Sequence, residues 1–458
     1  MNISGLSEYR GKRIHFIGIG GCSMSGLAMV LKNIGFDVSG SDARESAFTE
    51  KLKKENIPFT IGHDAKNTDG ANLVVYSAAV KPTNPEFMRA TELGIPTMQR
   101  SELLGKLSAE YNTVACVSGC HGKTTITSMT ALILITAAVD ATVHVGGMVG
   151  FLEGGVRLGQ SDILVTEACE YVESFLTLNP THIIVNNIDD DHLDYYRDIE
   201  HIYSTFVKFV RLLNSEGILF GNGDEPLVRR LMQETDVKKY TYGLGETNYF
   251  TAKNIVYDEN GSPSFDFYAG GQNKGRIALH IPGKHNVINA LAALALSTTV
   301  FHADMNACAK ALADYRLAGR RFELLGERNG VKIIHDYAHH PSEIDACLQA
   351  ARLYPHKKLW ALFQCNSFTR AKTLKDKYAL AFSAADEVIV PDIFPGRDID
   401  KGEIHAKDLV DAISKNARCV YIPTFEQIRE FLDKNAQSGD VVITLGSGDI
   451  NKQSLKLL

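Results

Sequence analysis

The sequence predicts an α/β protein that folds into three domains. Its 458 residues exceed what one hydrophobic core usually organises, so several domains are expected. Short apolar runs alternate with amphipathic stretches, which predicts parallel strands joined by helices. This alternation starts afresh near Lys106 and again after Gly319. Hydrophobic residues make up 45% and charged residues 22%, so each domain has enough apolar side chains to form a core.

Residues 1–107 are predicted to form a Rossmann-like domain. A strand at Ile14–Ile19 leads into a helix at Ser25–Ile34, and further strands are expected at Asp37–Gly40 and Leu73–Ser77. Because strands separated by helices pair in parallel, these elements predict a doubly wound sheet.

Residues 108–318 predict a central α/β domain of the P-loop ATPase type, and residues 319–458 predict a third, Rossmann-like domain. The elements expected in the central domain are Thr113–Ser118, Ile126–Ala138, Ile163–Thr166, Ile183–Asn187, a β-rich stretch over Lys239–His280, and a helix over Asn286–Thr299. Those expected in the third are strands Val331–His335, Leu359–Phe363, Glu387–Val390 and Asp440–Thr444, with a helix over Ser342–Arg352.

Charge and cysteine usage exclude several classes of protein. The formal net charge of -6 gives no basic field for a general nucleic-acid binder. The eight cysteines are scattered without a C-x-x-C pair, which predicts reduced thiols and a cytoplasmic protein. The N-terminus lacks a secretory signal, and the longest apolar stretch, near Met129–Val139, is too short to span a membrane. Monomer and homodimer both stay open.

The first glycine-rich turn predicts a nucleotide site. Gly18, Gly20 and Gly21 lie where a strand meets a helix, and glycines there let the backbone approach a pyrophosphate. Ser23 occupies the place of the third glycine in the usual pattern. Asp42 ends the next strand, where an acid can bind a ribose hydroxyl. A merely tight turn is the alternative.

A second loop predicts ATP binding more strongly. The loop follows a strand and opens a helix, so its N–H groups can surround phosphates, Lys123 can reach the β and γ phosphates, and Thr124 can bind Mg²⁺. The strict pattern asks for glycine where the chain has Val117. The residues of this loop are Gly119, Cys120, His121, Gly122, Lys123, Thr124 and Thr125.

Carboxylates after two later strands are candidate metal ligands. Glu167 follows an apolar strand at the sheet edge where α/β proteins bind ligands, and is the better candidate for magnesium. His192 stands among four aspartates in residues 189–194, as a second candidate. Such an acidic cluster is equally typical of a solvated helix N-terminus.

Polar residues near the second domain joint complete the candidate site. Asn286 and Asn289 suit a purine edge, although asparagine is also a common helix cap. The pair Arg320 and Arg321 suits a transferring phosphoryl group. Asp336, in the segment DYAHHP, suits a substrate contact or a general base.

Taken in order, the motifs of the chain resemble those of the Mur ligase family almost from end to end. These motifs are HFIGIGGCSMSGLA, VSGSD, SGCHGKTT, EACEYVESFL, NNIDDDHLDYY, IPGKHNVINALAALAL, GRRFELLGE, DYAHHPSEI, FQCNSFTR, ADEVIVPDIFPGRD and TLGSGDI. The resemblance implies three α/β domains that bind a UDP-sugar, ATP and an amino acid. It further implies an ATP-dependent ligase of peptidoglycan precursor synthesis that joins L-alanine to UDP-N-acetylmuramate through an acyl phosphate.

The resemblance also assigns roles to residues. Lys123 and Thr124 would hold the ATP phosphates and one magnesium ion, which Glu167 also ligates, and His192 would help to bind a second. The UDP moiety would be bound by Gly18, Gly20, Gly21, Ser41, Asp42 and Ser77, and adenine would be contacted by Asn286 and Asn289. The reacting groups would be covered by Arg320, Arg321 and Asp336, and the amino-acid pocket would lie near His339, His340 and Arg370. Domain closure at joints near Lys106 and Gly319 would exclude water.

Two departures from the family pattern bear on this assignment. Cys120 stands where the family usually has threonine, and Cys365-Asn366 stand where it commonly has Pro-His. The alternatives are a ligase for a recycled murein tripeptide, a non-catalytic nucleotide-binding homologue, and a nicotinamide dehydrogenase that uses the Gly18 loop. The dehydrogenase leaves the loop at Gly119 unexplained.

Overall fold

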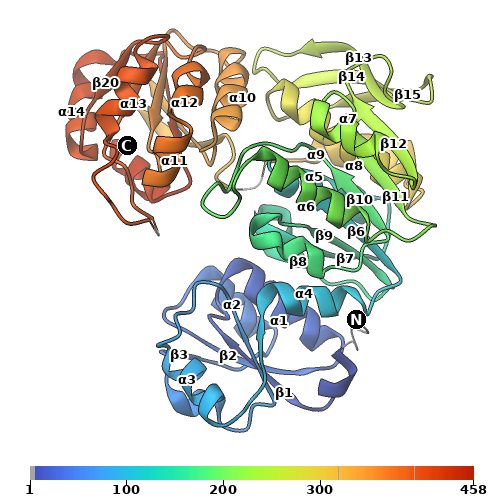
Figure 1. Cartoon of the computed structure of the whole chain (residues 1–458). Coiled ribbons are helices and arrows are strands. Elements are labelled where there is room, and N and C mark those ends of the chain that lie inside the picture. The colour runs from blue at the N-terminus through green and yellow to red at the C-terminus, as the bar shows by residue number, and fades with distance from the viewer. Residues whose placement is uncertain (1–5, 318, 397) are drawn as a thin grey trace. The chain divides into compact units, whose positions relative to one another are not determined.

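The computed structural model describes residues 6–317, 319–396 and 398–458, which form three β-sheets covered by helices (Figure 1). These residues divide into two compact units. One holds the chain up to Ile188 with residues 202–250 and 292–308, and the other holds residues 189–201, 251–291 and 309–458. Within the described residues, no helix is both long and apolar enough to cross a membrane.

The first sheet has the strand order β3-β2-β1-β4-β5, with every pair parallel. This order reverses direction at β1, and the crevice beyond the carboxyl end of β1 is where such sheets bind ligands. Its elements are η1 (Leu6–Tyr9), β1 (Arg13–Ile17), α1 (Cys22–Asn33), β2 (Asp37–Asp42), α2 (Ala47–Lys54), β3 (Phe59–Ile61), η2 (Ala65–Thr68), β4 (Leu73–Tyr76), α3 (Pro85–Glu92), β5 (Thr97–Gln99) and α4 (Arg100–Ser108).

Within the first unit, the second sheet runs in the order β12-β11-β10-β6-β9-β7-β8, with β6 in the middle of these strands. All pairs from β12 to β7 are parallel, and β8 turns back antiparallel to β7. Its elements are β6 (Thr113–Ser118), α5 (Lys123–Thr136), β7 (Thr142–Val149), η3 (Gly150–Leu152), β8 (Gly154–Arg157), β9 (Ile163–Glu167), η4 (Tyr171–Thr177), β10 (His182–Val185), α6 (Ile199–Val210), β11 (Ile218–Asn222), α7 (Pro226–Gln233) and β12 (Lys238–Gly243).

The chain then forms β13 (Phe250–Tyr257), β14 (Pro263–Ala269) and β15 (Gln272–Ala278), of which the last two pair antiparallel. Two helices follow, α8 (Lys284–Thr299) and α9 (Met305–Asp314).

The third sheet has the order β16-β17-β21-β18-β19-β20, with β16 antiparallel at one edge and the other pairs parallel. Its elements are β16 (Glu323–Arg328), β17 (Val331–Asp336), α10 (Pro341–Arg352), β18 (Leu359–Phe363), α11 (Phe368–Thr373), α12 (Lys375–Ala381), β19 (Glu387–Val390), α13 (Ala406–Ile413), β20 (Cys419–Tyr421), α14 (Phe425–Asn435), β21 (Val441–Leu445), α15 (Ile450–Ser454) and η5 (Leu455–Leu457).

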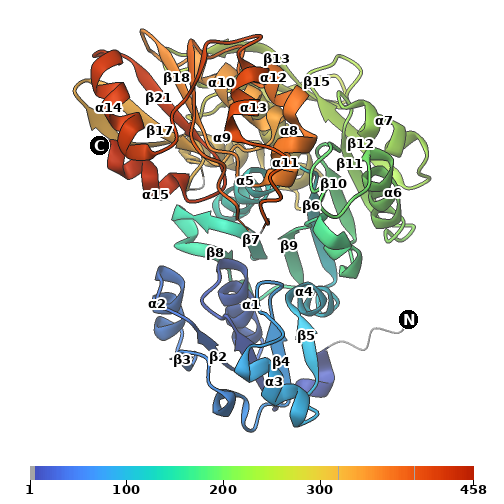
Figure 2. The ribbon, with the colours of Figure 1, turned by 60° about the vertical axis from the view of Figure 1, so that its left-hand side comes forward.

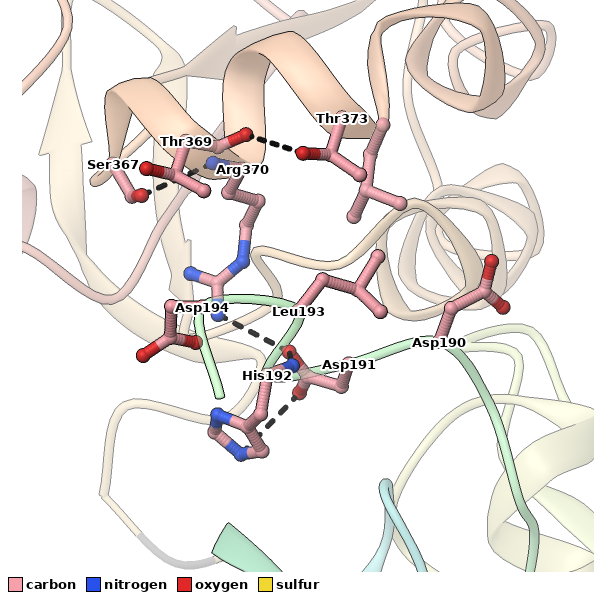
Figure 3. Close-up of a pocket in the computed structure, with 10 residues that line it drawn as sticks. Asp190, Asp191, His192, Leu193, Asp194, Ser367, Thr369, Arg370 and Thr373 are labelled. Carbon is pink, nitrogen blue, oxygen red and sulfur yellow. Dashed lines mark hydrogen bonds and ion pairs between the residues drawn. The ribbon is translucent and has the colours of Figure 1, made fainter. Parts of the chain in front are cut away.

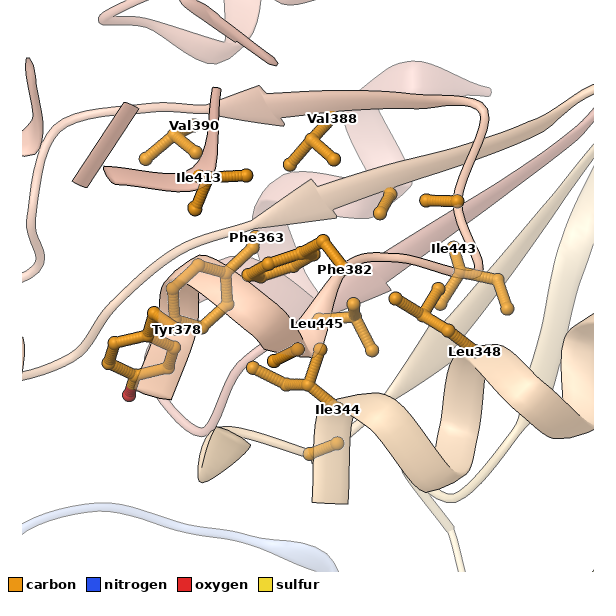
Figure 4. Close-up of a cluster of buried hydrophobic side chains, with 14 of the residues drawn as sticks. Ile344, Leu348, Phe363, Tyr378, Phe382, Val388, Val390, Ile413, Ile443 and Leu445 are labelled. Atoms are coloured by element: carbon orange, nitrogen blue, oxygen red, sulfur yellow. The ribbon is translucent and has the colours of Figure 1, made fainter. Parts of the chain in front are cut away.

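Both faces of the inner strands of this sheet are buried, which explains why β18 and β21 are almost entirely apolar. Along β18, Ala361 and Phe363 pack into the larger cluster, whereas Trp360 and Leu362 pack into a second cluster on the opposite face. The larger cluster is drawn in Figure 4, where Phe363 lies between Tyr378 and Phe382.

The predicted architecture of three α/β domains is confirmed, but some element bounds were wrong. The helices expected from Ser25 and Ile126 begin at Cys22 and Lys123. Each helix begins where its glycine loop ends. The first turn of each helix faces that loop and lacks the apolar spacing on which the prediction depended. The sequence analysis also missed β7 and β8, whose paired glycines interrupt the apolar alternation.

Candidate active site

The loop at residues 119–125 is held in place by two asparagines that follow β10. Gly119 has φ +127°, and a Cβ atom there would lie 3.0 Å from the backbone nitrogen of Asn187, so only glycine fits. The N–H of His121 donates to Asn187 Oδ1 at 2.8 Å, and Asn186 Nδ2 donates to the His121 carbonyl at 3.0 Å. The strand expected at Ile183–Asn187 ends at Val185, which releases both side chains for this role.

Lys123 begins α5 and folds back over its own loop. Its Nζ donates to the carbonyls of Gly119 at 2.5 Å and Cys120 at 3.1 Å, and it forms an ion pair with Glu170 Oε2 at 2.8 Å. Burial opposes the ammonium charge, but the Glu170 carboxylate outweighs it and raises the pKa of Lys123. Lys123 is therefore a fixed cation at the phosphate loop. Glu170 lies within the motif EACEYVESFL, but no local sequence signal marks it as the partner of Lys123.

Thr124 and Glu167, the two metal-ligand candidates of the first unit, both lie against the glycine pair of β7. A Cβ atom on Gly146 would lie 2.6 Å from Glu167 Oε2, and one on Gly147 would lie 3.3 Å from Thr124 Cγ2. The strand thus passes close to both side chains because it has no side chains of its own there. Thr125, the next residue of the loop, is buried.

In the first sheet, the Gly18–Gly21 turn is tied to the end of β2. The N–H groups of Gly18 and Ile19 donate to the Ser41 carbonyl at 2.8 and 2.9 Å, and the Gly20 N–H donates to Asp42 Oδ2 at 2.9 Å. A Cβ atom on Gly20 would lie 2.8 Å from that same carboxylate oxygen. Asp42 therefore shapes the turn itself, and its proposed contact with a ribose stays a prediction.

Behind this turn lies a buried carboxylate that the sequence analysis missed. Glu86, on α3, is 0% exposed, and it accepts hydrogen bonds from the Ser41 hydroxyl at 2.6 Å and from Asn67 Nδ2 at 2.7 Å. His15 Nε2 and His63 Nδ1 lie 3.2 and 3.3 Å from its oxygens.

Burial opposes the charge on Glu86, but the hydrogen bonds from His15, Ser41 and Asn67 hold its pKa at about 2. The Ser41 hydroxyl is thus directed inward, toward Glu86. Ser77, the remaining candidate in this sheet, follows β4, where its Oγ accepts from the Ala79 N–H at 3.4 Å.

The second unit contains a pocket between residues 190–194 and α11 (Figure 3). Arg370 points from α11 toward the loop, where its Nη2 donates to Asp191 Oδ1 at 3.1 Å. His192 lies beside the same carboxylate, with Nε2 3.8 Å from Asp191 Oδ2, and it has φ +56°. Asn366, one of the departures from the family pattern, accepts from Arg370 Nη1 at 2.6 Å. Asp191 and Asn366 together therefore fix the guanidinium.

The arginine pair is positioned by Asp336 and Tyr337. The guanidinium carbons of Arg320 and Arg321 lie 4.6 and 5.1 Å from the Tyr337 ring centroid. Asp336 accepts backbone N–H groups from Phe322 at 2.8 Å and from Ala338 at 2.7 Å, one on each carboxylate oxygen. Burial raises the pKa of Asp336. These contacts give Asp336 a structural role in holding the turn that carries the arginines.

His339 and His340 lie at the start of α10 beside Glu343. The His339 Nδ1 is 3.2 Å from Glu343 Oε2, and burial lowers the pKa of His339 to about 4. His340 caps the helix and its Nε2 lies 3.2 Å from the Asp190 carbonyl. His340 thus connects the start of α10 to the loop that carries His192.

Asn286 and Asn289 face each other in the first turns of α8. Asn289 Nδ2 donates to Asn286 Oδ1 at 3.2 Å, and Asn286 Nδ2 donates to the Pro282 carbonyl at 2.7 Å. Burial, aided by the positive charge of Arg321, lowers the pKa of His285 to about 4. The predicted adenine loop and the arginine pair are therefore neighbours within the second unit.

Three family models match consecutive parts of the chain. They are "Mur ligase family, catalytic domain" over residues 13–112, "Mur ligase middle domain" over 117–297, and "Mur ligase, glutamate ligase domain" over 320–448. The chain belongs to the Mur ligase family. Among curated Mur ligases, the UDP-N-acetylmuramate–L-alanine ligase of Acetivibrio thermocellus is 45% identical over 98% of this chain and 96% of its own length. That of Caldanaerobacter subterraneus subsp. tengcongensis is 43% identical, over 98% and 97%.

Solved Mur ligase structures share the fold. The UDP-N-acetylmuramate–alanine ligase of Thermotoga maritima aligns with a TM-score of 0.78 at 28% identity, covering 97% of this chain and 98% of that one. A murein peptide ligase from Psychrobacter arcticus aligns with a TM-score of 0.71 at 23% identity, covering 98% of each chain.

Proposed function

We propose that this Mur ligase joins L-alanine to the lactyl carboxylate of UDP-N-acetylmuramate at the expense of ATP. The carrying observation is the identity of 45% and 43%, over nearly the whole chain, to curated ligases of that name. The structure supports it with a phosphate loop whose lysine, threonine and neighbouring carboxylate are all present. The proposal places the reaction in the cytoplasm, where ATP is available.

The residues at the phosphate loop fit a magnesium ion. Thr124 offers a hydroxyl and Glu167 a carboxylate, which are the hard oxygen ligands that Mg²⁺ prefers. The bare backbone of Gly146 and Gly147 leaves space beside both. When bound, the ion would offset negative charge on the phosphates of ATP. We assign His192, in the second unit, to a second ion.

In the first step, an oxygen of the lactyl carboxylate attacks the γ-phosphorus of ATP, and ADP leaves with the electrons of the broken bond. The product is an acyl phosphate. Negative charge spreads over the transferring group, so Lys123 would stabilise it after exchanging its loop carbonyls for phosphate oxygens. The backbone N–H groups of the loop would hold the β phosphate.

In the second step, the amine of alanine attacks the acyl carbon, and inorganic phosphate leaves as the amide forms. We assign Arg370 to the alanine carboxylate, because a guanidinium held by Asp191 and Asn366 keeps a defined orientation for a carboxylate. Arg320 and Arg321 would approach the phosphoryl group from the third sheet. Exclusion of water by domain closure would protect the acyl phosphate from hydrolysis.

The test is an incubation of the purified protein with ATP, Mg²⁺ and UDP-N-acetylmuramate, with L-alanine, with L-alanyl-γ-D-glutamyl-meso-diaminopimelate, or with neither. ADP release that depends on alanine, with a product whose mass equals that of the amide, supports the proposal. Activity with the tripeptide alone would reassign the chain to murein peptide ligation. ATP binding without turnover on either substrate would identify a non-catalytic homologue.

A further inference from the structure

A series of hydrogen bonds connects α1 to β9, the strand that ends at Glu167. Arg100 Nη1 donates to Ser23 Oγ at 3.1 Å, and Ser23 Oγ lies 3.0 Å from His144 Nε2. His144 Nδ1 lies 3.3 Å from Thr166 Oγ1, which in turn donates to the Glu167 carbonyl at 3.1 Å. The four side chains come from α4, α1, β7 and β9.

The direction of each bond in this chain follows from the donors available. Thr166 has one hydroxyl proton, which it gives to the Glu167 carbonyl, so it must accept from a protonated Nδ1 of His144. Ser23 accepts from Arg100, so its own proton is available for the bare Nε2. His144 is 3% exposed, and burial together with Arg100 lowers its pKa to about 4, so the ring is neutral and carries one proton. Every donor thus meets an acceptor.

The two ends of this series of hydrogen bonds lie at the two proposed ligand sites of the first unit. Ser23 is in the first turn of α1, directly after the Gly18–Gly21 turn. At the other end, His144 is two residues before Gly146, which passes beside the Glu167 carboxylate. The first helix packs directly on this histidine, because a Cβ atom on Gly26 would lie 3.4 Å from His144 Cδ2. Figure 2 shows α1 beside β7 and β8.

We propose that Ser23, His144 and Thr166 form a positioning relay that sets the glycine turn of the first sheet against Glu167. The inference rests on the proposed function: one substrate, UDP-N-acetylmuramate, would be held by its UDP at the glycine turn and present its lactyl carboxylate near Glu167. The relay contacts neither reacting group. Loss of the relay would shift the glycine turn relative to Glu167. It would therefore raise the KM for UDP-N-acetylmuramate more than the KM for ATP.

The test compares Ser23→Ala, His144→Phe and the double variant in steady-state kinetics. Each single change is expected to raise the KM for UDP-N-acetylmuramate about three- to tenfold, the cost of one or two lost hydrogen bonds. The KM of the double variant is expected to rise no further than that of the worse single variant, because both substitutions interrupt the same series of hydrogen bonds. The KM for ATP stays within about twofold. Ser23→Thr, which keeps the hydroxyl, restores most of the loss.

The matched control is Ser25→Ala, in the same turn of α1. Ser25 is buried, whereas Ser23 is partly exposed, and among the described residues the Ser25 hydroxyl donates to the Cys22 carbonyl of its own helix at 3.0 Å. The kinetics of Ser25→Ala should therefore stay as in the natural chain. Unchanged KM values in Ser23→Ala and His144→Phe, additive effects in the double variant, or an equal rise in the KM for ATP would each overturn the relay.

A second measurement is independent of turnover. In the ¹⁵N spectrum of the whole protein, the signals of the His144 ring nitrogens are identified as those that disappear in His144→Phe. We expect these signals to show a proton on Nδ1 and none on Nε2. The opposite tautomer overturns the relay. If the natural chain binds UDP-N-acetylmuramate in calorimetry but shows no turnover with alanine, the proposed function fails. The relay is then tested by the Kd of the same variants for UDP-N-acetylmuramate. If the natural chain does not bind this substrate, both fail.

Discussion

The ion pair between Lys123 and Glu170 holds the lysine side chain in a defined position at the loop of residues 119–125. A flexible ammonium group is held at 2.8 Å by a carboxylate whose side chain is only 1% exposed. An unpaired charge at such a site is costly, so the pair orders the lysine before any phosphate arrives. Lys123 therefore contributes to the folded state in addition to its proposed part in the chemistry.

These two roles can be separated by mutation. Lys123→Met removes the ammonium group that lies 2.8 Å from the buried Glu170 carboxylate, so we expect a loss of about 3 kcal/mol in unfolding free energy and no measurable ADP release. The double variant Lys123→Met with Glu170→Gln should recover most of the stability and none of the activity. Urea denaturation and ADP release measure the two effects. Recovery of activity in the double variant would remove Lys123 from the proposed mechanism.

Glu86 predicts a pH dependence of stability. Its pKa is about 2 in the folded protein against an ordinary value of 4.5, so the unfolded chain takes up the proton first. The stabilisation by Glu86 is therefore complete above about pH 4.5 and is lost as the pH falls toward 2. The difference in urea midpoint between the natural chain and Glu86→Gln should be largest at pH 7, smaller at pH 3, and should vanish as the pH approaches 2.

The control for this change is Glu92→Gln on the same helix. Glu92 is exposed, and its ion pair with Arg89, at 3.6 Å, contributes little because solvent screens it. Its urea midpoints should follow those of the natural chain at both pH values. A gap between Glu86→Gln and the natural chain that stays constant from pH 7 to pH 3 would contradict the assigned pKa.

At the scale of elements, β7 shapes the candidate active site because two of its residues are glycines. Its two glycines let the strand pass beside Thr124 and Glu167, which sit on two other elements, α5 and β9. A side chain at either position would occupy the space proposed for the metal ion. The glycines thus act on residues that are distant in sequence.

We expect Gly146→Ala to lower kcat at least tenfold while the fold persists, because the new methyl group would lie 2.6 Å from Glu167 Oε2 and displace the carboxylate. Gly150→Ala is the matched control, since a Cβ atom there meets no atom within 4 Å. Activity at a series of Mg²⁺ concentrations and thermal unfolding measure the effect. Natural activity and Mg²⁺ dependence in Gly146→Ala would separate Glu167 from metal binding.

At the scale of the whole molecule, the candidate residues are distributed over two compact units. The glycine turn, Lys123, Thr124 and Glu167 belong to one, whereas His192, Arg320, Arg321, Asp336, Arg370 and the two asparagines of α8 belong to the other. A reaction that uses both sets requires the units to adopt a defined arrangement around the substrates. Under the proposed function, substrate binding would supply the free energy for closure of the two units.

Small-angle X-ray scattering should detect this closure. We expect the radius of gyration to fall when UDP-N-acetylmuramate and a non-hydrolysable ATP analogue are added together with Mg²⁺. The double variant Lys123→Met with Glu170→Gln, which is expected to fold, should show a smaller change because it holds the γ phosphate poorly. Identical scattering with and without ligands would exclude a closure large enough to exclude water.

The sequence by itself determined the architecture, and it predicted the kinds of site. Apolar runs of strand length alternate with helical periodicity, and glycines follow strands at Gly18 and Gly119, because local backbone physics requires both patterns. It also supplied most of the candidate residues, since glycine loops and acids after strands have short-range signatures.

The tertiary structure decided which partners these residues have. Glu170 against Lys123, Glu86 behind Ser41, Gly146 beside Glu167, and His144 between Ser23 and Thr166 are contacts between segments far apart in the chain. No local pattern encodes them, because they follow from strand order and from the register of neighbouring strands. A buried polar group must find its partner wherever the fold places one, and only packing in three dimensions determines where that is.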